Sequence, residues 1–450
     1  VERLANPAPS VTALSGAGGI GKTTLAAAAA RQLAKARFPD GIAVIVGGGV
    51  GGAELTDPPD VLNQVLARFE PGYRQPGETD MAKLANEANR LLNGKQVLIV
   101  IDDVHPELSV GSVIQPLLRA GAVILLTARR VFPGDVVPAE GYRLLDVLPL
   151  ASARELFVQQ MTSQAKKALD TRDLANIDRV VNALERHTLA IKLAGAYAAE
   201  TSLNLDDLLR ELMPQPLDVP VPKDTPPGVW LIFRGSLERL GIHARRLFAA
   251  LAVFATEEFG ERAAVEVATS LDIIDPRATL DLLCHRAFVS RQESHDMPEG
   301  SDSVRLHLHP LLQQFARIEF DSLSTTLQYQ MHRAVTQFFA RYVQETSARA
   351  FGADQRNIAG ALDWASEHSD AELVAQLCTG MQYFWRDRWL TRYSLRYLPI
   401  GIDAAQEIWK KTQLDVDRLH IADLELTYAQ VLRRSGQMQE AEGVLQTNLQ

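Results

Sequence analysis

The chain has 450 residues, of which 46% are hydrophobic and 22% are charged, and its formal net charge is −9. This composition excludes a disordered or fibrous protein, and the length predicts about three domains at roughly 150 residues each. The acidic balance disfavours a protein dominated by nucleic-acid binding, and no apolar run approaches the roughly 20 residues of a membrane span. Two distant cysteines, Cys284 and Cys378, are typical of a reducing compartment and predict a cytoplasmic protein. The chain starts without Met or a signal-peptide pattern and stops inside a helical pattern, so we expect both ends to be cut.

The first 150 residues alternate short apolar runs with segments of helical periodicity. Runs that are apolar throughout are typical of strands buried on both faces of a parallel sheet. The pattern predicts a five-stranded α/β domain. The expected strands are 11–14, 42–46, 97–101, 123–126 and 142–145, and the expected helices are 23–36, 60–69, 81–92 and 114–119.

Helical patterns replace the strand signal from residue 151 onward. Ser152 and Glu155 have the spacing of a capping box that opens the first of these helices. Residues 214–228 contain six prolines and therefore predict an extended linker. Short helices and an expected hairpin, 288–292 with 304–309, then suggest a winged-helix domain, and helix pairs fill the remaining chain.

The motif that carries chemistry is the segment 16–23, GAGGIGKT, which follows an apolar strand and opens a helix. Its glycines allow backbone N–H groups to wrap a phosphate, and the helix N-terminus favours an anion. Lys22 should reach the β- and γ-phosphates, and the hydroxyl of Thr23 should bind Mg²⁺. A chance glycine-rich turn is the alternative, which the flanking strand and helix disfavour. The expected nucleotide-binding residues are Gly16, Gly18, Gly19, Gly21, Lys22, Thr23 and Thr24.

A second element, 97–103, is an apolar strand that ends in two carboxylates and has the form of a Walker B motif. Asp102 would bind Mg²⁺, directly or through water, and Asp103 would orient the attacking water. A strand that ends at a solvated turn is the alternative, but the position about 80 residues after a P-loop favours the Walker B interpretation. Arg129 follows the next strand and is a candidate γ-phosphate sensor, although a solvated arginine pair with Arg130 explains it equally well.

Two further patterns have competing interpretations. Residues 47–52 fit G-x-G-x-x-G, but no helix follows directly, so we predict a surface loop rather than a dinucleotide site. His307 and His309 alternate on one strand and could bind a metal, but no ligand set accompanies them, which favours a structural or switch role. Trp385 and Trp389 are expected in helix packing rather than in a ligand box.

The order of these motifs resembles the NB-ARC ATPases of the STAND class, in the bacterial form with tetratricopeptide-like repeats. The resemblance rests on VTALSGAGGIGKTTL at 11–25, VLIVIDDV at 97–104, ILLTARR at 124–130, LPLASARELF at 148–157, LFAALAVFA at 247–255 and RLHLHPLL at 305–312. It implies that Arg129 is the sensor arginine and that His309 contacts the β-phosphate of ADP and locks a closed state.

The chain departs from the family pattern at two positions. Thr188 replaces the proline that lines the nucleotide pocket, and Pro310 replaces the aspartate that follows the histidine. The segment that helps to hold adenine normally lies well before the P-loop, so we expect adenine recognition to be incomplete in this chain.

The resemblance implies a fold class: an α/β P-loop NTPase domain, an all-α helical subdomain, a winged-helix domain and α-helical TPR-like repeats. The last helix pair, 423–434 and 438–447, fits one such repeat, with Tyr428, Ala429, Leu432, Ala441 and Leu445 at packing positions. The predicted boundaries are 1–148, 149–213, 214–228 (linker), 229–321 and 322–450.

The leading functional hypothesis is a slow ATPase that acts as a switch: Mg²⁺ and ATP or ADP bind, the repeats sense a protein or peptide, and the ATP form self-assembles. The alternative is a transcription regulator that uses the winged helix, or a domain outside the chain, on DNA. Arg234, Arg239, Arg245 and Arg246 form the local basic cluster that this alternative would use. A metabolic P-loop kinase is a third hypothesis, which the long helical region disfavours.

Overall fold

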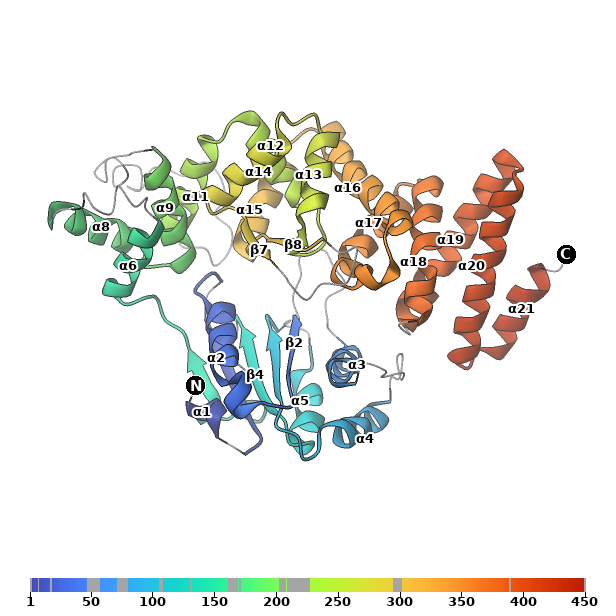
Figure 1. Cartoon of the computed structure of the whole chain (residues 1–450), viewed down its shortest axis with the longest axis horizontal. Coiled ribbons are helices and arrows are strands. Elements are labelled where there is room, and N and C mark those ends of the chain that lie inside the picture. Colours follow the sequence, from blue (N-terminus) through green and yellow to red (C-terminus); the bar gives the residue numbers. More distant parts are fainter. Residues whose placement is uncertain are drawn as a thin grey trace.

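A computed structural model describes residues 2–6, 8–16, 18–46, 57–70, 80–104, 108–129, 132–160, 169, 171–201, 208, 227–293, 302–387 and 390–448. The glycine-rich segment 47–52, most of the proline-rich linker, Arg130 and Trp389 lie outside these residues. In Figure 1 an α/β unit lies below a curved row of helices that runs from α6 to α21.

The N-terminal unit contains a five-stranded parallel sheet of order β2-β3-β4-β1-β5. Sequential strands are therefore not all neighbours, and β1 lies between β4 and β5. This arrangement brings the carboxyl ends of β1, β3 and β4 side by side, where ligands bind in open α/β sheets. The strands are β1 (Ser10–Ser15), β2 (Ile42–Val46), β3 (Leu98–Asp102), β4 (Val123–Ala128) and β5 (Tyr142–Leu144).

Helices cover both faces of this sheet, which explains why its strands are apolar throughout. Ile99 and Ile101 of β3 pack with α3, α4 and α5, whereas Leu98 and Val100 pack on the opposite face with α1 and α2. The helices are α1 (Glu2–Ala5), α2 (Lys22–Arg37), α3 (Pro58–Phe69), α4 (Met81–Leu92) and α5 (Val110–Arg119), with a short 3-10 turn, η1 (Ala139–Gly141), before β5.

A group of helices follows the sheet: α6 (Leu150–Gln160), α8 (Thr171–Ala183), α9 (Thr188–Thr201) and α11 (Pro227–Glu238). The predicted capping box is wrong, because α6 begins at Leu150 and Ser152 lies inside its first turn. The helix therefore begins two residues earlier than the polar pattern indicated.

The next group combines helices with a three-stranded antiparallel sheet of order β6-β8-β7, as in a winged helix. The expected hairpin is present, but the sequence did not predict β6, because three residues are too few to show a period. The elements are α12 (Ile242–Leu251), β6 (Glu258–Gly260), α13 (Glu261–Ser270), α14 (Pro276–His285), β7 (Ser290–Glu293), β8 (Val304–His307) and α15 (Pro310–Asp321).

Helices alone form the remainder of the chain: α16 (Thr325–Glu345), the 3-10 turn η2 (Ala348–Ala353), α17 (Gln355–Glu367), α18 (Ala371–Asp387), α19 (Thr391–Thr412), α20 (Asp415–Arg434) and α21 (Met438–Asn448). Successive helices from α18 onward pack against one another. Ala429, Leu432 and Ala441 form a small apolar cluster with Tyr428 and Leu445, as the repeat pattern predicted. Trp385 is buried and stacks on Tyr397 with ring centroids 5.5 Å apart, which agrees with a packing role.

The distribution of apolar cores separates the α/β unit from the helices that follow it. One continuous cluster extends from α6 through the winged-helix group to α20, whereas the sheet has two clusters of its own. Among the described residues, hydrogen bonds join the two parts at the carboxyl edge of the sheet, through His187 and Thr188, and at α3, through Arg392. An interface of this kind is easier to open than a shared apolar core.

Candidate nucleotide-binding site

The loop between β1 and α2 has the backbone shape of a phosphate cradle. Gly19 has φ +74° and Gly21 has φ +106°, values that side-chain-bearing residues rarely adopt. Gly21 caps α2 and has no side chain to offer a cap bond, and the first turn of this helix contains no acidic residue. The N-terminal N–H groups of α2 and the helix dipole are therefore suited to an anion.

Lys22 supplies the cation of the loop. Its side-chain Nζ donates to the carbonyl oxygen of Gly16 at 2.9 Å, so the side chain folds back along the loop that a phosphate would occupy. Burial lowers the pKa of Lys22, and Arg129 lowers it further, whereas Asp103 and Asp102 oppose the shift.

The hydroxyl of Thr23 and the carboxylate of Asp102 meet at the end of β3. The Oγ1 atom of Thr23 lies 3.0 Å from both carboxylate oxygens of Asp102, and Thr127 Oγ1 donates to the same carboxylate. Hydroxyl and carboxylate oxygens are the ligands that Mg²⁺ prefers, so this donor set fits the ion.

Asp103 and Arg129 extend the site along the edge of the sheet. The backbone N–H of Asp103 donates to Thr127 Oγ1 at 2.8 Å, and Asp103 adopts φ +48°. The Nε atom of Arg129 lies 3.7 Å from Asp103 Oδ1, and both side chains remain partly exposed. The structure thus places Arg129 beside Asp103 at the edge of the sheet, and its role as a γ-phosphate sensor stays a prediction.

Two segments from the C-terminal part of the chain close over the loop. His187, just before α9, has its Nε2 atom 2.7 Å from the carbonyl oxygen of Gly18, and Thr188 donates from Oγ1 to the carbonyl oxygen of Ile20 at 3.0 Å. His309, the residue that caps α15, lies near the same loop. A Cβ atom added to Gly19 would lie 2.7 Å from Cε1 of His187 and 3.2 Å from Cε1 of His309.

Burial determines the charge of His309. Burial, together with the nearby groups His307, His187, Arg129 and Lys22, lowers the pKa of His309 to about 3. The backbone N–H of Leu311 donates to Nδ1 of His309 at 3.1 Å. His309 is therefore neutral, its Nδ1 accepts a bond, and its Nε2 carries the proton that can face a phosphate oxygen.

Glu257 is a residue of this region that the sequence did not indicate. Burial raises the pKa of Glu257, Asp103 and Asp102 also raise it, and Arg129 opposes them, with a net value of about 8. Its backbone oxygen accepts a hydrogen bond from the N–H of Leu308 at 2.8 Å. Nothing in the sequence could reveal this carboxyl group, because only the tertiary structure brings it near the Walker B aspartates.

The structure gathers most of the predicted residues in one place. The P-loop residues, the two aspartates and Arg129 meet at the carboxyl edge of the sheet, and Thr188 and His309 reach the loop from distant segments. Thr24 points to the exposed side of α2. His187 was missed as a site residue, although its position beside Thr188 in the family motif was a usable signal. Within the described ranges, no three or more His, Cys, Asp or Glu side chains lie together in a group that could hold a metal ion. His307 and His309 therefore belong to no such group.

The sheet order, the glycine loop and the Walker B strand define a P-loop NTPase with a helical C-terminal region. The family model of the NB-ARC domain matches residues 1–142. Residues 1–142 of the chain therefore form an NB-ARC domain. Within the described ranges, no helix combines the length and apolar character needed to cross a lipid bilayer.

The chain is similar to curated proteins and to solved structures. It is 28% identical over 322 residues to the regulatory protein AfsR of Streptomyces griseus, covering 68% of this chain and 30% of that protein. It is 33% identical over 204 residues to AfsR of Streptomyces coelicolor, covering 42% of this chain and 18% of that protein. The chain thus spans less than a third of these relatives. A STAND protein with a tetratricopeptide repeat sensor from Pyrococcus horikoshii has a similar fold, with a TM-score of 0.53, 16% identity, and coverage of 98% of this chain and 62% of that one.

Proposed function

We propose that this chain is a nucleotide-dependent switch that holds ADP in the closed arrangement described above and opens when ATP replaces it. The open form self-assembles and activates an effector, and the C-terminal repeats sense a protein or peptide that favours opening. A ligand shifts such an equilibrium only as far as its affinity differs between the two forms. Residues that contact the nucleotide in one form only are therefore the centre of the proposal.

The observation that carries the proposal is the closure of the P-loop by side chains from two separate C-terminal segments. His187 and Thr188 bond to loop carbonyls, and His309 lies against Gly19. The apolar cores of the α/β unit and the helical region are separate, so these polar contacts can break without unfolding either part.

Each residue of the site has a role in this scheme. Lys22 and the loop N–H groups bind the β-phosphate, Arg129 reads the γ-phosphate, and neutral His309 donates to the diphosphate of ADP. Thr23 and Asp102 would hold Mg²⁺, which when bound neutralises charge on the phosphates. Asp103 orients a water molecule for slow hydrolysis, which resets the switch. We propose the same boundaries as those drawn from the sequence, with residues 322–450 as the sensor.

The first test measures fluorescent ADP binding to Lys22→Ala. Loss of the cation that lies along the loop should abolish binding, whereas Lys35→Ala, an exposed lysine on the same helix, should bind like the wild type. Unchanged binding by Lys22→Ala would refute the nucleotide site.

A second test addresses the closed state. His309→Ala should release ADP faster, and size-exclusion chromatography should show larger assemblies with a non-hydrolysable ATP analogue than with ADP. If His309→Ala releases ADP at the wild-type rate, His309 does not hold ADP in the closed form.

A transcription regulator of the same class is the second candidate, because both curated relatives are named regulatory proteins. The basic cluster offered for DNA is largely paired in this structure. Arg234 Nε lies 2.7 Å from Glu238 Oε1, and Arg245 Nη2 lies 3.1 Å from Glu319 Oε2. These carboxylates reduce the positive potential that a phosphate backbone would meet. Salt-dependent binding of duplex DNA by this chain would favour the winged helix as the DNA contact, and its absence at low salt would exclude that contact.

A further inference from the structure

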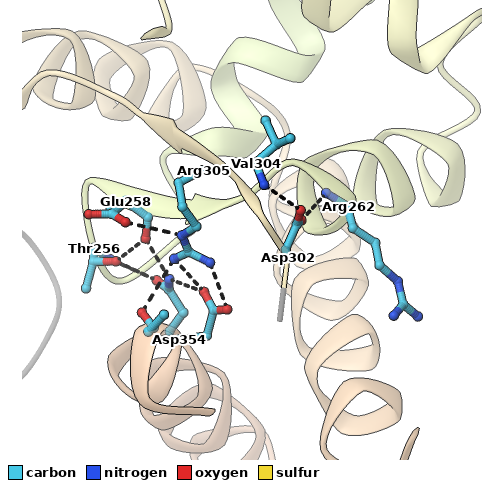
Figure 2. Close-up of polar contacts among 9 residues, drawn as sticks. Thr256, Glu258, Arg262, Asp302, Val304, Arg305 and Asp354 are labelled. Atoms are coloured by element: carbon cyan, nitrogen blue, oxygen red, sulfur yellow. Dashed lines mark hydrogen bonds and ion pairs between the residues drawn. The ribbon is translucent and has the colours of Figure 1, made fainter. Parts of the chain in front are cut away.

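A buried ion pair joins the winged-helix sheet to the first helices of the repeat region. The guanidinium of Arg305, on β8, donates from Nη1 to Asp354 Oδ2 at 2.9 Å and from Nη2 to Asp354 Oδ1 at 3.0 Å. The side chain of Arg305 is 4% exposed and that of Asp354 is 6% exposed. Asp354 caps the junction between η2 and α17, so this bidentate pair links β8 to a helix of the repeats (Figure 2).

A second contact fixes the chain segment just before β6 to the same helix. Asn357 of α17 accepts from the N–H of Thr256 at 3.0 Å and donates from Nδ2 to the carbonyl oxygen of Glu258 at 3.0 Å. Figure 2 shows Thr256 and Glu258 beside Arg305 and Asp354 in one polar cluster. The helix α17 therefore holds both β6 and β8, which pair with each other.

Residues just outside the same two strands, Glu257 before β6 and His309 after β8, lie near the nucleotide site. β8 runs from Val304 to His307 and is followed by Leu308 and His309, whose ring lies against Gly19 of the P-loop. Glu257 stands between Thr256 and Glu258, and its backbone bonds Leu308, the residue before His309. Electrostatic interaction of Glu257 with Asp103 and Arg129 agrees with this placement at the edge of the site. One short stretch of sheet thus touches α17 on one side and the P-loop region on the other.

We propose that Asp354 is a positioning residue of the nucleotide site, which through Arg305 fixes β8 so that His309 stays against the P-loop and retains ADP. This inference rests on the proposed ADP-holding role of His309. It names the contact by which the repeats control ADP release: movement of α17 withdraws Asp354, β8 loses its buried counter-charge, and His309 leaves the loop. Arg305 would keep its 3.2 Å ion pair with Glu258, but that side chain is 60% exposed, and a buried charge that loses its buried partner strongly disfavours the arrangement that buries it.

Other connections between the repeats and the rest of the chain are weaker candidates for this role. Arg392 of α19 bonds Asp60 of α3 at 2.9 Å, but these side chains are 72% and 40% exposed. Arg262 of the winged helix and Glu345 of α16 form an ion pair at 3.2 Å, but their side chains are also at the surface, 48% and 58% exposed. Exposed pairs of this kind contribute little, because water and salt screen them.

The decisive experiment is a double-mutant cycle on the full chain, with the dissociation rate of fluorescent ADP as the readout. Asp354→Asn keeps the shape and removes the charge, and it should raise the rate by roughly 5- to 150-fold, the usual range of coupling between distant sites. In the His309→Ala background the same change should alter the rate less than about twofold, since Asp354 acts through His309. Glu345→Gln, which breaks the exposed pair between the same two regions, is the matched control and should leave the rate unchanged.

Several results would overturn the inference. They are an unchanged rate for Asp354→Asn, an equal effect with and without His309, and an equal effect of Glu345→Gln. If Asp354→Asn does not fold, Arg305→Lys, which keeps the charge but loses the bidentate contact, takes its place in the same cycle with the same expected outcomes. Failure of the proposed function gives a different signature, because the wild type would then not bind ADP or His309→Ala alone would not change its release.

Discussion

The Nε2 atom of His187 lies 2.7 Å from the carbonyl oxygen of Gly18, although 169 positions separate the two residues in the sequence. This contact ties the helix that follows the α/β unit to the phosphate loop itself. Together with the bond from Thr188 to Ile20, it makes the loop part of the boundary between the two regions. A change in loop conformation on nucleotide binding would therefore alter these contacts with the start of α9.

Thr188→Ala tests whether this contact stabilises the closed arrangement. The substitution removes the donor to the carbonyl oxygen of Ile20, so the free energy of unfolding should fall by about 1 kcal/mol. Urea unfolding without nucleotide measures the change. Thr24→Ala, an exposed threonine of α2, serves as the control and should have almost no effect. Equal effects of the two substitutions would show that the Thr188 contact contributes nothing to stability.

Asp102→Asn tests the proposed magnesium ligands. The change removes the charge that accepts from Thr23 and Thr127, so ADP affinity should become insensitive to Mg²⁺. Calorimetric titration of ADP with Mg²⁺ and with EDTA measures this dependence. Asp103→Asn should keep the Mg²⁺ dependence while abolishing hydrolysis. If Asp102→Asn retains the wild-type dependence, the ion is held elsewhere.

Glu257→Gln should change how stability depends on pH between about 4.5 and 8. The pKa of Glu257 is raised to about 8 from an ordinary value of 4.5, mainly by burial and then by Asp103. The folded state therefore binds a proton that the unfolded state loses, and stability falls as pH rises from about 4.5 to about 8. The Gln variant has no carboxyl group at this position, so it lacks this fall in stability. Urea unfolding across this range should show the two proteins diverging with pH, and parallel curves would exclude a buried neutral Glu257.

His309→Gln should change the acid side of the same profile. Burial, with help from His307 and His187, lowers the pKa of His309 from 6.5 to about 3. Below about pH 6.5 the unfolded state takes up a proton that the folded state refuses, so stability falls as pH decreases toward about 3. The variant lacks this contribution, and its stability relative to the wild type should rise as pH falls. A pH-independent difference would show that His309 titrates normally.

Local sequence was sufficient to predict the elements whose physics is local. Buried parallel strands are continuously apolar, and the glycines and lysine of a phosphate loop follow one another directly, so β1, β3, β4 and the loop could be predicted with their neighbours. The hairpin of the winged helix and the last helix pair were also predictable from period and turns. β6 was not, because its three residues acquire their conformation only by pairing with β8.

The sequence by itself determined the class of this protein, because motif order and spacing survive without coordinates. It also indicated His309 and Thr188, through resemblance rather than geometry. Only the tertiary structure decided that His187 and Glu257 belong to the same region, and that Arg305 and Asp354 form a buried pair behind it. Burial, charge neighbours and contacts between distant segments arise from packing, and no local pattern in the chain encodes which residues packing will bring together.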